Sequence, residues 1–246
     1  MIDFTIAQTK QRLIRAFRLK YPISLPLKIV IVTYNRLPYL MKCIASIQAS
    51  TTLPYQITVM DDGSTDGTVK WLSEQRKRGK IDYLVFNKRV GTAENFNQGI
   101  QFANCEWVVM ANDDCYFHRW WDFAALQVIN AEPEAATVTL YDFTNNSGIL
   151  ERKKDYDQVT GTGLATAFIR SLALYQAGEF KLPPKQKMGS FAAKTCAKMK
   201  RFSDSKLHFI TRPCWTHHMD FPTSKLSERD VLRKYVEYRR KEKKIK

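Results

Sequence analysis

A continuous apolar run, Leu27–Thr33 (LKIVIVT), constrains the fold more than any other feature of this 246-residue chain. A β-branched run of this kind predicts a strand that is buried on both faces, as in a parallel sheet. Apolar residues at helical spacing follow it, and strand and helix then alternate, with further strands expected at 56–60, 81–86 and 107–111. This alternation predicts an α/β fold with a mostly parallel sheet flanked by crossover helices.

The pattern is looser outside this region. Residues 5–20 fit a short basic amphipathic helix, followed by a proline-punctuated linker. Beyond residue 115 we expect a helix at 120–129, a strand at 136–141 and a helix at 165–177, and a basic terminal helix at 226–238. With 44% hydrophobic residues the chain has the composition of a globular protein, and its length suits one catalytic domain with appendages.

The net charge of +15 is unevenly distributed. Residues 29–150 carry 10 Lys and Arg against 13 Asp and Glu, whereas residues 1–28 carry 6 against 1 and residues 151–246 carry 23 against 10. An acidic centre between basic flanks fits a metal site that faces an anionic partner. Nucleic acid and an anionic membrane surface are both open as that partner, since summed charge attracts them alike.

Polar residues follow three of the expected strands, at the point where each strand ends. They are Thr33-Tyr34-Asn35-Arg36, Asp61-Asp62 and Asn112-Asp113-Asp114. The carboxyl ends of parallel strands form the ligand-binding edge of an α/β sheet, so these clusters should meet there. Adjacent carboxylates are costly unless a positive group neutralises them, and a divalent cation with oxygen ligands is one solution. The chain has neither a GxGxxG nor a GxxxxGK[ST] sequence, which argues against Rossmann dinucleotide and P-loop chemistry.

Four motifs in order, IVIVTYNR, VMDDGSTDGT, GTAENFNQGI and WVVMANDD, resemble family 2 of the GT-A glycosyltransferases. The resemblance covers residues 27–118 and implies a GT-A (Rossmann-like) fold in which this stretch is the nucleotide-sugar-binding half. Residues 119–224 would then form the basic, less regular acceptor-side half of the same catalytic domain. Residues 1–26 would be a basic N-terminal helix and linker, and residues 225–246 a basic C-terminal helix and tail.

The resemblance also implies roles for single residues. Either Asp61 or Asp62 would accept a hydrogen bond from the base, although Asp62-Gly63 is also an ordinary turn sequence. Asp113 would bond the ribose or the diphosphate, and Asp114 would hold Mn²⁺ or Mg²⁺, which makes this pair catalytic. The remaining donor-binding residues implied are Thr33, Tyr34, Asn35, Arg36, Arg89, Gly91, Asn95 and Asn112.

The chain departs from the family in its second half, where the usual Glu-Asp pair that supplies the general base is missing. Glu179 and Asp157 lead the candidates for this base, because a base must reach the acceptor near the sugar. Asp142, Asp155 and Asp204 are further candidates. His217 or His218 lies where some GT-A enzymes bring a late histidine to the metal, and we take His217 as the expected ligand, with a structural histidine as the alternative.

The resemblance therefore implies a metal-dependent, inverting glycosyltransferase that uses a nucleotide-sugar, with a UDP-sugar as the first expectation. The alternative is a catalytically inactive protein of the same fold that binds nucleotide-sugar or nucleic acid. Five cysteines without a CxxC pair favour a reduced, cytoplasmic compartment. No apolar run approaches the roughly 20 residues of a membrane span, which leaves peripheral association with a membrane open.

Overall fold

The computed structural model describes residues 26–140, 149–160, 166–181, 208–212 and 216–219. The expected helices at 5–20 and 226–238, and most of the basic stretch between residues 181 and 212, lie outside these residues. Among the described residues no helix has both the length and the apolar character needed to cross a bilayer.

The first half of the chain alternates strands with helices as its hydrophobic pattern predicts. Its strands lie in the spatial order β3-β2-β1-β4, all parallel, and each strand begins and ends within two residues of its expected place. The elements are β1 (Leu27–Thr33), α2 (Leu37–Ser50), β2 (Tyr55–Asp61), α3 (Thr68–Lys77), β3 (Tyr83–Phe86), α4 (Thr92–Ala103) and β4 (Trp107–Asn112).

The second half extends the same sheet with a different pairing pattern. The order continues β4-β9-β6-β10-β8-β7, and among these described strands only β6 and β10 pair in parallel. The elements are β5 (Cys115–Phe117), α5 (Trp121–Ala131), β6 (Thr137–Thr139), β7 (Ile149–Arg152), β8 (Tyr156–Val159), β9 (Thr166–Arg170), α6 (Ser171–Gln176), β10 (His208–Thr211) and β11 (Thr216–His218). The predicted α/β fold is confirmed, with a sheet that is parallel in its first half and mixed beyond it.

The prediction of a helix at 165–177 is wrong for the first part of this range. Residues 166–170 (TAFIR) form β9, which pairs antiparallel with both β4 and β6, and only residues 171–176 are helical. The side chains of Ala167, Phe168 and Ile169 are all fully buried, so both faces of the strand contact the core. Apolar spacing alone cannot separate such a strand from a buried helix.

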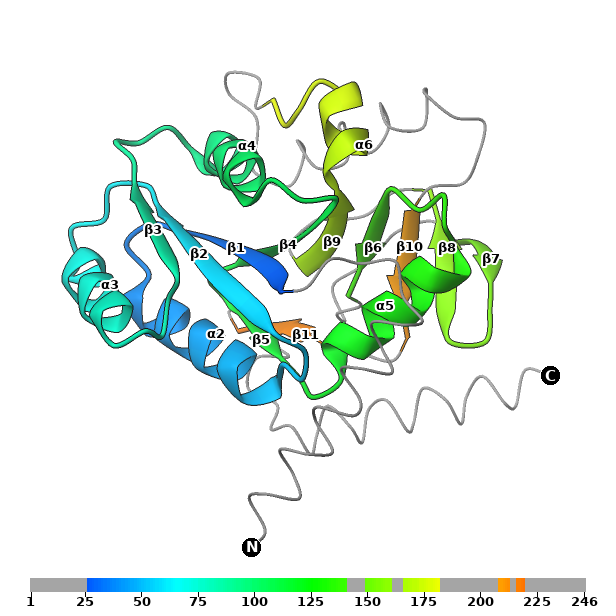
Figure 1. The fold of residues 1–246 in the computed structure, drawn as a ribbon, viewed down its shortest axis with the longest axis horizontal. Coiled ribbons are helices and arrows are strands. Elements are labelled where there is room, and N and C mark those ends of the chain that lie inside the picture. The colour runs from blue at the N-terminus through cyan, green and yellow to red at the C-terminus, as the bar shows by residue number, and fades with distance from the viewer. Residues whose placement is uncertain (1–25, 141–148, 161–165, 182–207, 213–215, 220–246) are drawn as a thin grey trace, which may run out of the picture.

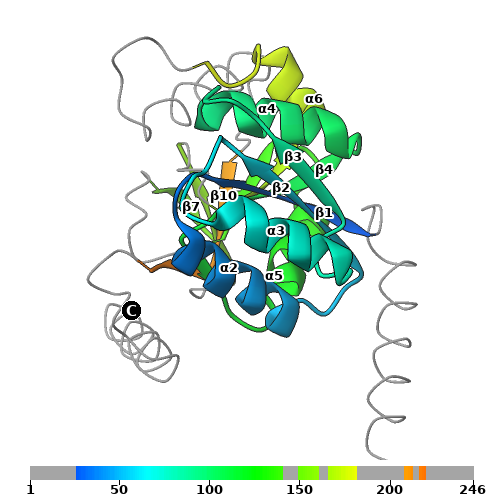
Figure 2. The ribbon, with the colours of Figure 1, turned by 90° about the vertical axis from the view of Figure 1, so that its left-hand side faces the viewer.

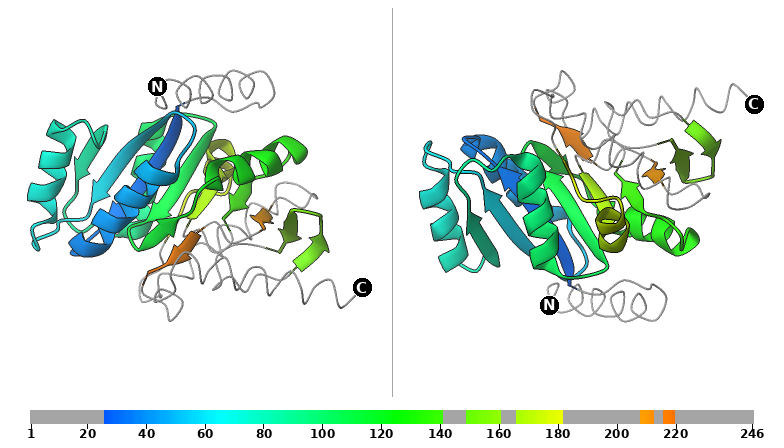
Figure 3. Two further views of the ribbon diagram at one scale, coloured as in Figure 1. Left: turned by 90° about the horizontal axis from the view of Figure 1, so that it is seen from below. Right: turned by 90° about the horizontal axis from the view of Figure 1, so that it is seen from above.

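Helices cover both faces of the sheet, so the molecule has three layers (Figures 1 and 2). Views from below and above show α2, α3 and α5 on one face and α4 and α6 on the other (Figure 3). One apolar core fills each interface, with Ile29, Ile31 and Leu40 in the first and Val30, Phe96 and Met110 in the second. Successive residues of β1 enter opposite cores, and this is why the strand is apolar along its whole length.

Candidate functional site

The carboxyl ends of β1, β2 and β4 lie side by side at one edge of the sheet. Thr33 is in register with Asp61 of β2, and Val32 with Asn112 of β4. The backbone N–H of Asp62 also donates to the carbonyl oxygen of Thr33 at 2.9 Å. The structure therefore brings the three polar clusters of the sequence together, as the parallel order of these strands requires.

Asp113 and Asp114, directly after β4, form the acidic centre of this edge. Their side chains are 7% and 13% exposed. The hydroxyl of Thr33 donates to Asp113 Oδ2 at 2.7 Å. The guanidinium of Arg36 lies 3.7 Å from Asp113 Oδ1 and 3.2 Å from Asp114 Oδ2, and it also lies over the ring of Tyr39, 4.8 Å from the centroid. One cation thus bridges both carboxylates.

The negative charge of this pair reaches the helix beneath it. Burial raises the pKa of the Cys43 thiol, on α2, and the charges of Asp113 and Asp114 raise it further. The thiol donates to the carbonyl oxygen of Asn112 at 3.5 Å. Cys43 therefore has the surroundings of a protonated, buried thiol that supports the end of β4.

The loops after β1 and β2 hold each other through side-chain hydrogen bonds. Asn35, with a φ of 50°, donates its N–H to Ser64 Oγ at 2.9 Å and accepts at Oδ1 from the Thr65 N–H at 2.6 Å. Asp66 accepts the Leu37 N–H at 3.1 Å and so caps α2, besides accepting from the N–H and hydroxyl of Thr68 at the start of α3. These contacts place Arg36 at the entrance of α2.

Asp61 and Asp62, which the sequence could not tell apart, have different surroundings. Asp61 is fully buried: its Oδ2 accepts the N–H groups of Gly63 and Ser64, and its Oδ1 has no hydrogen-bond partner among the described residues. Gly63 has a φ of 87°, and a Cβ there would lie 3.2 Å from the Asn87 carbonyl oxygen, so this turn requires glycine. Asp61 is thereby part of the turn structure.

Asp62 instead points to the start of α4. Its Oδ1 accepts the Val90 and Gly91 N–H groups, at 2.8 and 3.2 Å, and the Asn95 side-chain amide at 2.9 Å. Within the part of the chain that the structure describes, its Oδ2 accepts only from the Gly91 N–H, at 3.1 Å, and so keeps room for a further donor. Asp62 therefore combines a fixed position with spare acceptor capacity.

Tyr34 and Arg89 form a stacked pair at the same edge. The Arg89 guanidinium lies 3.7 Å from the centroid of the Tyr34 ring, and the Tyr34 side chain is 38% exposed. Arg89 has a φ of 58°, a left-handed conformation that is uncommon for a residue with a side chain. The pair offers a flat surface and a positive charge next to Asp62, since Val90 and Gly91 bind that carboxylate.

The acidic centre has the donor chemistry of a site for a hard divalent cation, which prefers carboxylate oxygens. The described residues contain no cluster of three or more acidic, histidine or cysteine side chains around one point, so Asp113 and Asp114 are the protein ligands they can supply. Nucleotide phosphates and water would have to complete the shell. The backbone of β11 pairs with β5, His218 being in register with Cys115, and the Met219 N–H donates to the Asp114 carbonyl oxygen at 2.7 Å. The side chains of His217 and His218 lie outside the described residues.

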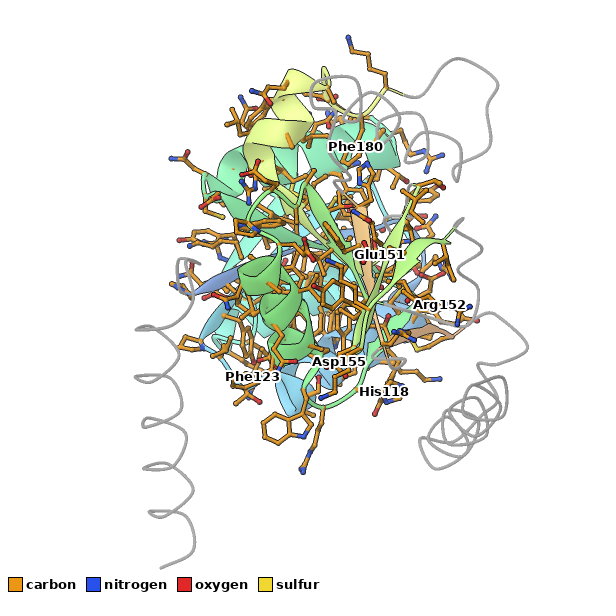
Figure 4. The ribbon with its side chains drawn as sticks, turned by 90° about the vertical axis from the view of Figure 1, so that its right-hand side faces the viewer. His118, Phe123, Glu151, Arg152, Asp155 and Phe180 are labelled. Atoms are coloured by element: carbon orange, nitrogen blue, oxygen red, sulfur yellow. The ribbon has the colours of Figure 1, made fainter. Side chains whose placement is uncertain are left out.

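The two leading candidates for the general base lie elsewhere. Asp157 is in β8, four places beyond β4 in the sheet order, and forms an ion pair with Arg212 at 3.3 Å, with both side chains about 10% exposed or less. Figure 4 shows Asp155, from the turn next to it, well below Phe180 in the view. The structure does not bring Asp157 to the strand-end cluster.

Glu179 lies just before Phe180, in a loop that α4 holds in place. The side-chain amide of Asn97 donates to the Phe180 carbonyl oxygen and accepts the Phe180 N–H, both at 3.0 Å. Glu179 has a φ of 61° and is half-buried. Asn97 is five residues from the start of α4, about 7.5 Å along the helix from the end that Asp62 binds. The remaining candidates Asp142 and Asp204 lie outside the described residues.

Sequence reasoning missed the contacts that hold this site together. Arg36 appeared as a donor-binding residue, not as the counter-ion of Asp113 and Asp114. The pair of hydrogen bonds between the Asn97 side chain and the Phe180 backbone joins residues 83 positions apart, and no local sequence signal indicates it. The motif Asp61–Thr68 did contain a signal, because Asp and Ser commonly accept backbone N–H groups in turns.

A family model described as glycosyl transferase family 2 matches residues 28–216. Among curated proteins, a Campylobacter jejuni GalNAc(5)-diNAcBac-PP-undecaprenol beta-1,3-glucosyltransferase is 33% identical over 90 residues, which are 36% of this chain and 29% of the relative. The chain spans 59% of the length of one curated glycosyltransferase that it matches, and 33% or less of five others.

Solved structures share the fold. GalNAc-T7 with UDP, GalNAc and Mn²⁺ has a TM-score of 0.64 at 15% identity, covering 79% of this chain and 44% of that one. A mannosyltransferase from Pyrobaculum calidifontis, in complex with GDP-Man and Mn²⁺, has a TM-score of 0.58 at 19% identity, covering 85% and 62%.

Proposed function

Since the chain belongs to glycosyl transferase family 2, we propose that it transfers a sugar from a nucleoside diphosphate sugar to an acceptor hydroxyl, with inversion at the sugar carbon. The observation that carries this proposal is the hydrogen-bonded convergence of Thr33, Asp62 and Asp113 at the carboxyl edge of the sheet. That edge supplies a base acceptor, an aromatic surface and an acidic pair, which are the groups that a nucleotide-sugar needs.

The donor nucleotide would lie between the loops after β1, β2 and β3. Asp62 would accept an N–H of the base at Oδ2, because that oxygen has acceptor capacity and Asp61 is enclosed in its turn. Tyr34 would stack on the base, and Arg89 would move from the Tyr34 ring toward the base or the phosphates. Asn35, Gly91 and Asn95 would keep these loops in position through the contacts described above. The structural relatives were solved with UDP and with GDP-Man, and we propose a UDP-sugar first, because the family resemblance implies uridine as the commonest base.

Asp114 would hold Mn²⁺ or Mg²⁺, while Asp113, fixed by Thr33, would orient the ribose or diphosphate. When bound, the metal offsets the negative charge of the leaving diphosphate. The Mn²⁺ bound by the two structural relatives and the oxygen ligands of this pair both support the assignment. His217 stays a proposed further ligand, on the ground that β11 runs beside β5 and ends next to Asp114.

Glu179 is the better of the two proposed general bases. Asp157 is neutralised by Arg212 and is separated from β4 by β9, β6 and β10. Glu179 is half-buried on the α4 side of the sheet, and its loop runs from the far end of β4 back along α4 toward the donor edge. A base at this place would take the proton of the acceptor hydroxyl as it attacks the sugar.

The acceptor, or the surface that carries it, would be anionic. The support is the charge of the flanks, 23 Lys and Arg against 10 Asp and Glu in residues 151–246, and the relative that acts on an undecaprenol-linked glycan. We place an anionic membrane surface before nucleic acid for that reason, with the protein peripheral to the membrane on its cytoplasmic side. Binding of the full chain to anionic vesicles at low salt, with no competition by DNA, is the expected result.

Thermal unfolding with a panel of nucleotide-sugars, with and without Mn²⁺, tests the donor assignment, because a ligand that binds only the folded state raises the melting temperature. One donor should stabilise the chain, and more so with Mn²⁺. Release of sugar to water from that donor separates the enzyme from the inactive binding protein, which would bind without hydrolysis. If no nucleotide-sugar or nucleotide shifts the melting temperature, the proposed function is wrong.

A further inference from the structure

The guanidinium of Arg36 lies against one oxygen of each carboxylate in the acidic centre. Asp113 Oδ2 already accepts the Thr33 hydroxyl, and Asp114 Oδ1 lies 3.8 Å from the Cys115 thiol. The other two oxygens, Asp113 Oδ1 and Asp114 Oδ2, lie nearest to the guanidinium, at 3.7 and 3.2 Å. A metal ion held by Asp114 beside Asp113 would therefore meet the guanidinium at these oxygens.

The position of Arg36 is set by the fold and is not that of a loose surface side chain. Its backbone stands at the N-cap of α2, where its carbonyl oxygen accepts the Tyr39 and Leu40 N–H groups. Its guanidinium lies over the Tyr39 ring, and its side chain is 33% exposed. The carboxylates it faces are more deeply buried, so water and salt screen their attraction only in part.

We propose that Arg36 is a built-in counter-ion that neutralises Asp113 and Asp114 until the donor binds, and that the metal binds together with the nucleotide diphosphate. Two adjacent carboxylates need a positive partner, and Arg36 supplies it in the absence of metal. A divalent ion that arrives alone meets occupied oxygens and a like charge. A diphosphate adds negative charge at the same place, so Arg36 can turn to the phosphates while the metal takes the carboxylates.

This inference rests on the proposed metal site and adds that the metal and the nucleotide bind cooperatively. It predicts strong coupling, in which nucleotide diphosphate raises Mn²⁺ affinity and Mn²⁺ raises nucleotide affinity by the same factor. Removing the guanidinium should free the oxygens for Mn²⁺ alone and should shrink the coupling. An arginine that only contacts the donor would weaken nucleotide binding without improving metal binding.

The test is Mn²⁺ binding to the full-length chain without substrate, followed through the electron spin resonance signal of free Mn²⁺. Arg36→Gln should bind Mn²⁺ alone about tenfold more tightly than wild type, a ratio within the usual range of coupling between sites. Adding UDP, with GDP in parallel, should tighten Mn²⁺ binding much less in this variant than in wild type. Uridine, which has no diphosphate, should not tighten it in either.

Two further variants separate the possible outcomes. Lys42→Gln removes the same charge from an exposed position of α2, and its Mn²⁺ affinity should change by no more than about twofold, because exposed charges are screened. Asp114→Asn should lose the Mn²⁺ site. If Asp114→Asn loses Mn²⁺ and Arg36→Gln binds it no more tightly than Lys42→Gln, the counter-ion role is wrong and the metal site stands. If Asp114→Asn binds Mn²⁺ as wild type does, the proposed metal site is wrong, and the counter-ion proposal is refuted with it.

Discussion

The acidic residues of the two halves of this chain have different partners, although they belong to one sheet. In the first half, Asp61, Asp62, Asp113 and Asp114 follow parallel strands and gather at one edge, where they bind backbone N–H groups, Thr33 and Arg36. In the second half, Asp157 and Glu132 form ion pairs with Arg212 and Lys153 of neighbouring segments. Asp62, Asp113 and Asp114 are therefore placed where a ligand can reach them, whereas Asp157 and Glu132 stabilise the fold and Asp61 stabilises its turn.

The largest expected effect is the loss of turnover when a carboxylate at the strand ends, Asp114, is removed. Asp114→Ala should reduce turnover by at least about a hundredfold, since a metal ligand contributes several kcal/mol to the transition state. It should also remove the effect of Mn²⁺ on donor binding while the thermal unfolding of the free protein stays close to wild type. Initial rates with and without EDTA check this. Wild-type turnover of the variant in EDTA would contradict the metal assignment.

The second prediction contrasts the two proposed bases. Glu179→Gln should lower turnover by about 10²-fold or more, the range for loss of a general base, with donor affinity and stability unchanged. Asp157→Asn should instead lower the free energy of unfolding by about 3 kcal/mol, because it leaves the Arg212 guanidinium buried without its counter-charge.

Urea unfolding and single-turnover rates, measured on both variants, make the comparison. The opposite result, an inactive but stable Asp157→Asn, would show that a carboxylate beside antiparallel strands can also be catalytic. The acids of the second half would then not be confined to stabilising the fold.

The third prediction concerns the two neighbouring acids at the end of β2. Asp62→Asn should weaken binding of the donor or its nucleotide by about 1–3 kcal/mol, the usual cost of an unpaired buried hydrogen-bond partner. Asp61→Asn should act mainly on stability, because its carboxylate accepts two N–H groups inside the Gly63 turn. Isothermal titration with UDP and GDP, together with thermal unfolding, distinguishes them. Equal, negligible losses of affinity would mean that both acids only shape the turn.

The smallest expected effect is a pH dependence at Asp66. Partial burial acts to raise the pKa of this carboxyl, but hydrogen bonds from the Thr68 hydroxyl and from the Leu37 and Thr68 N–H groups lower it overall. A lowered folded-state pKa means that the stabilisation is present at neutral pH and is lost as the pH falls below the ordinary value of about 3.9.

Asp66→Ala should therefore be less stable than wild type at pH 7 by about 1 kcal/mol, as for other helix caps, and the difference should shrink as the pH falls toward 3. Urea unfolding of both proteins across this range measures it. A difference that stays constant with pH would show that the charge of Asp66 contributes nothing.

The sequence by itself determined the first half of the fold and the members of the site. The runs at Leu27–Thr33 and Trp107–Asn112 are too apolar for a strand exposed on either face, so they specify central parallel strands whose carboxyl ends must meet. Once those strands are parallel, Thr33, Asp62 and Asp113 converge without further information. Local chemistry and global topology agree in this region, because each polar cluster follows its strand directly.

Only the tertiary structure decided the partners of these residues. That residues 166–170 form a strand depends on the open edges of β4 and β6, which no local pattern reveals. The bridge of Arg36 to both Asp113 and Asp114 depends on where α2 begins relative to the end of β4, and Asp113 lies 77 residues further along the chain than Arg36 (113 − 36). Asp157 has the side chain of a general base, but β10 places Arg212 beside it, and a carboxylate paired in the interior of the sheet is not available for catalysis. The sequence specifies the charges, and the contacts between distant segments decide which of them a ligand can reach.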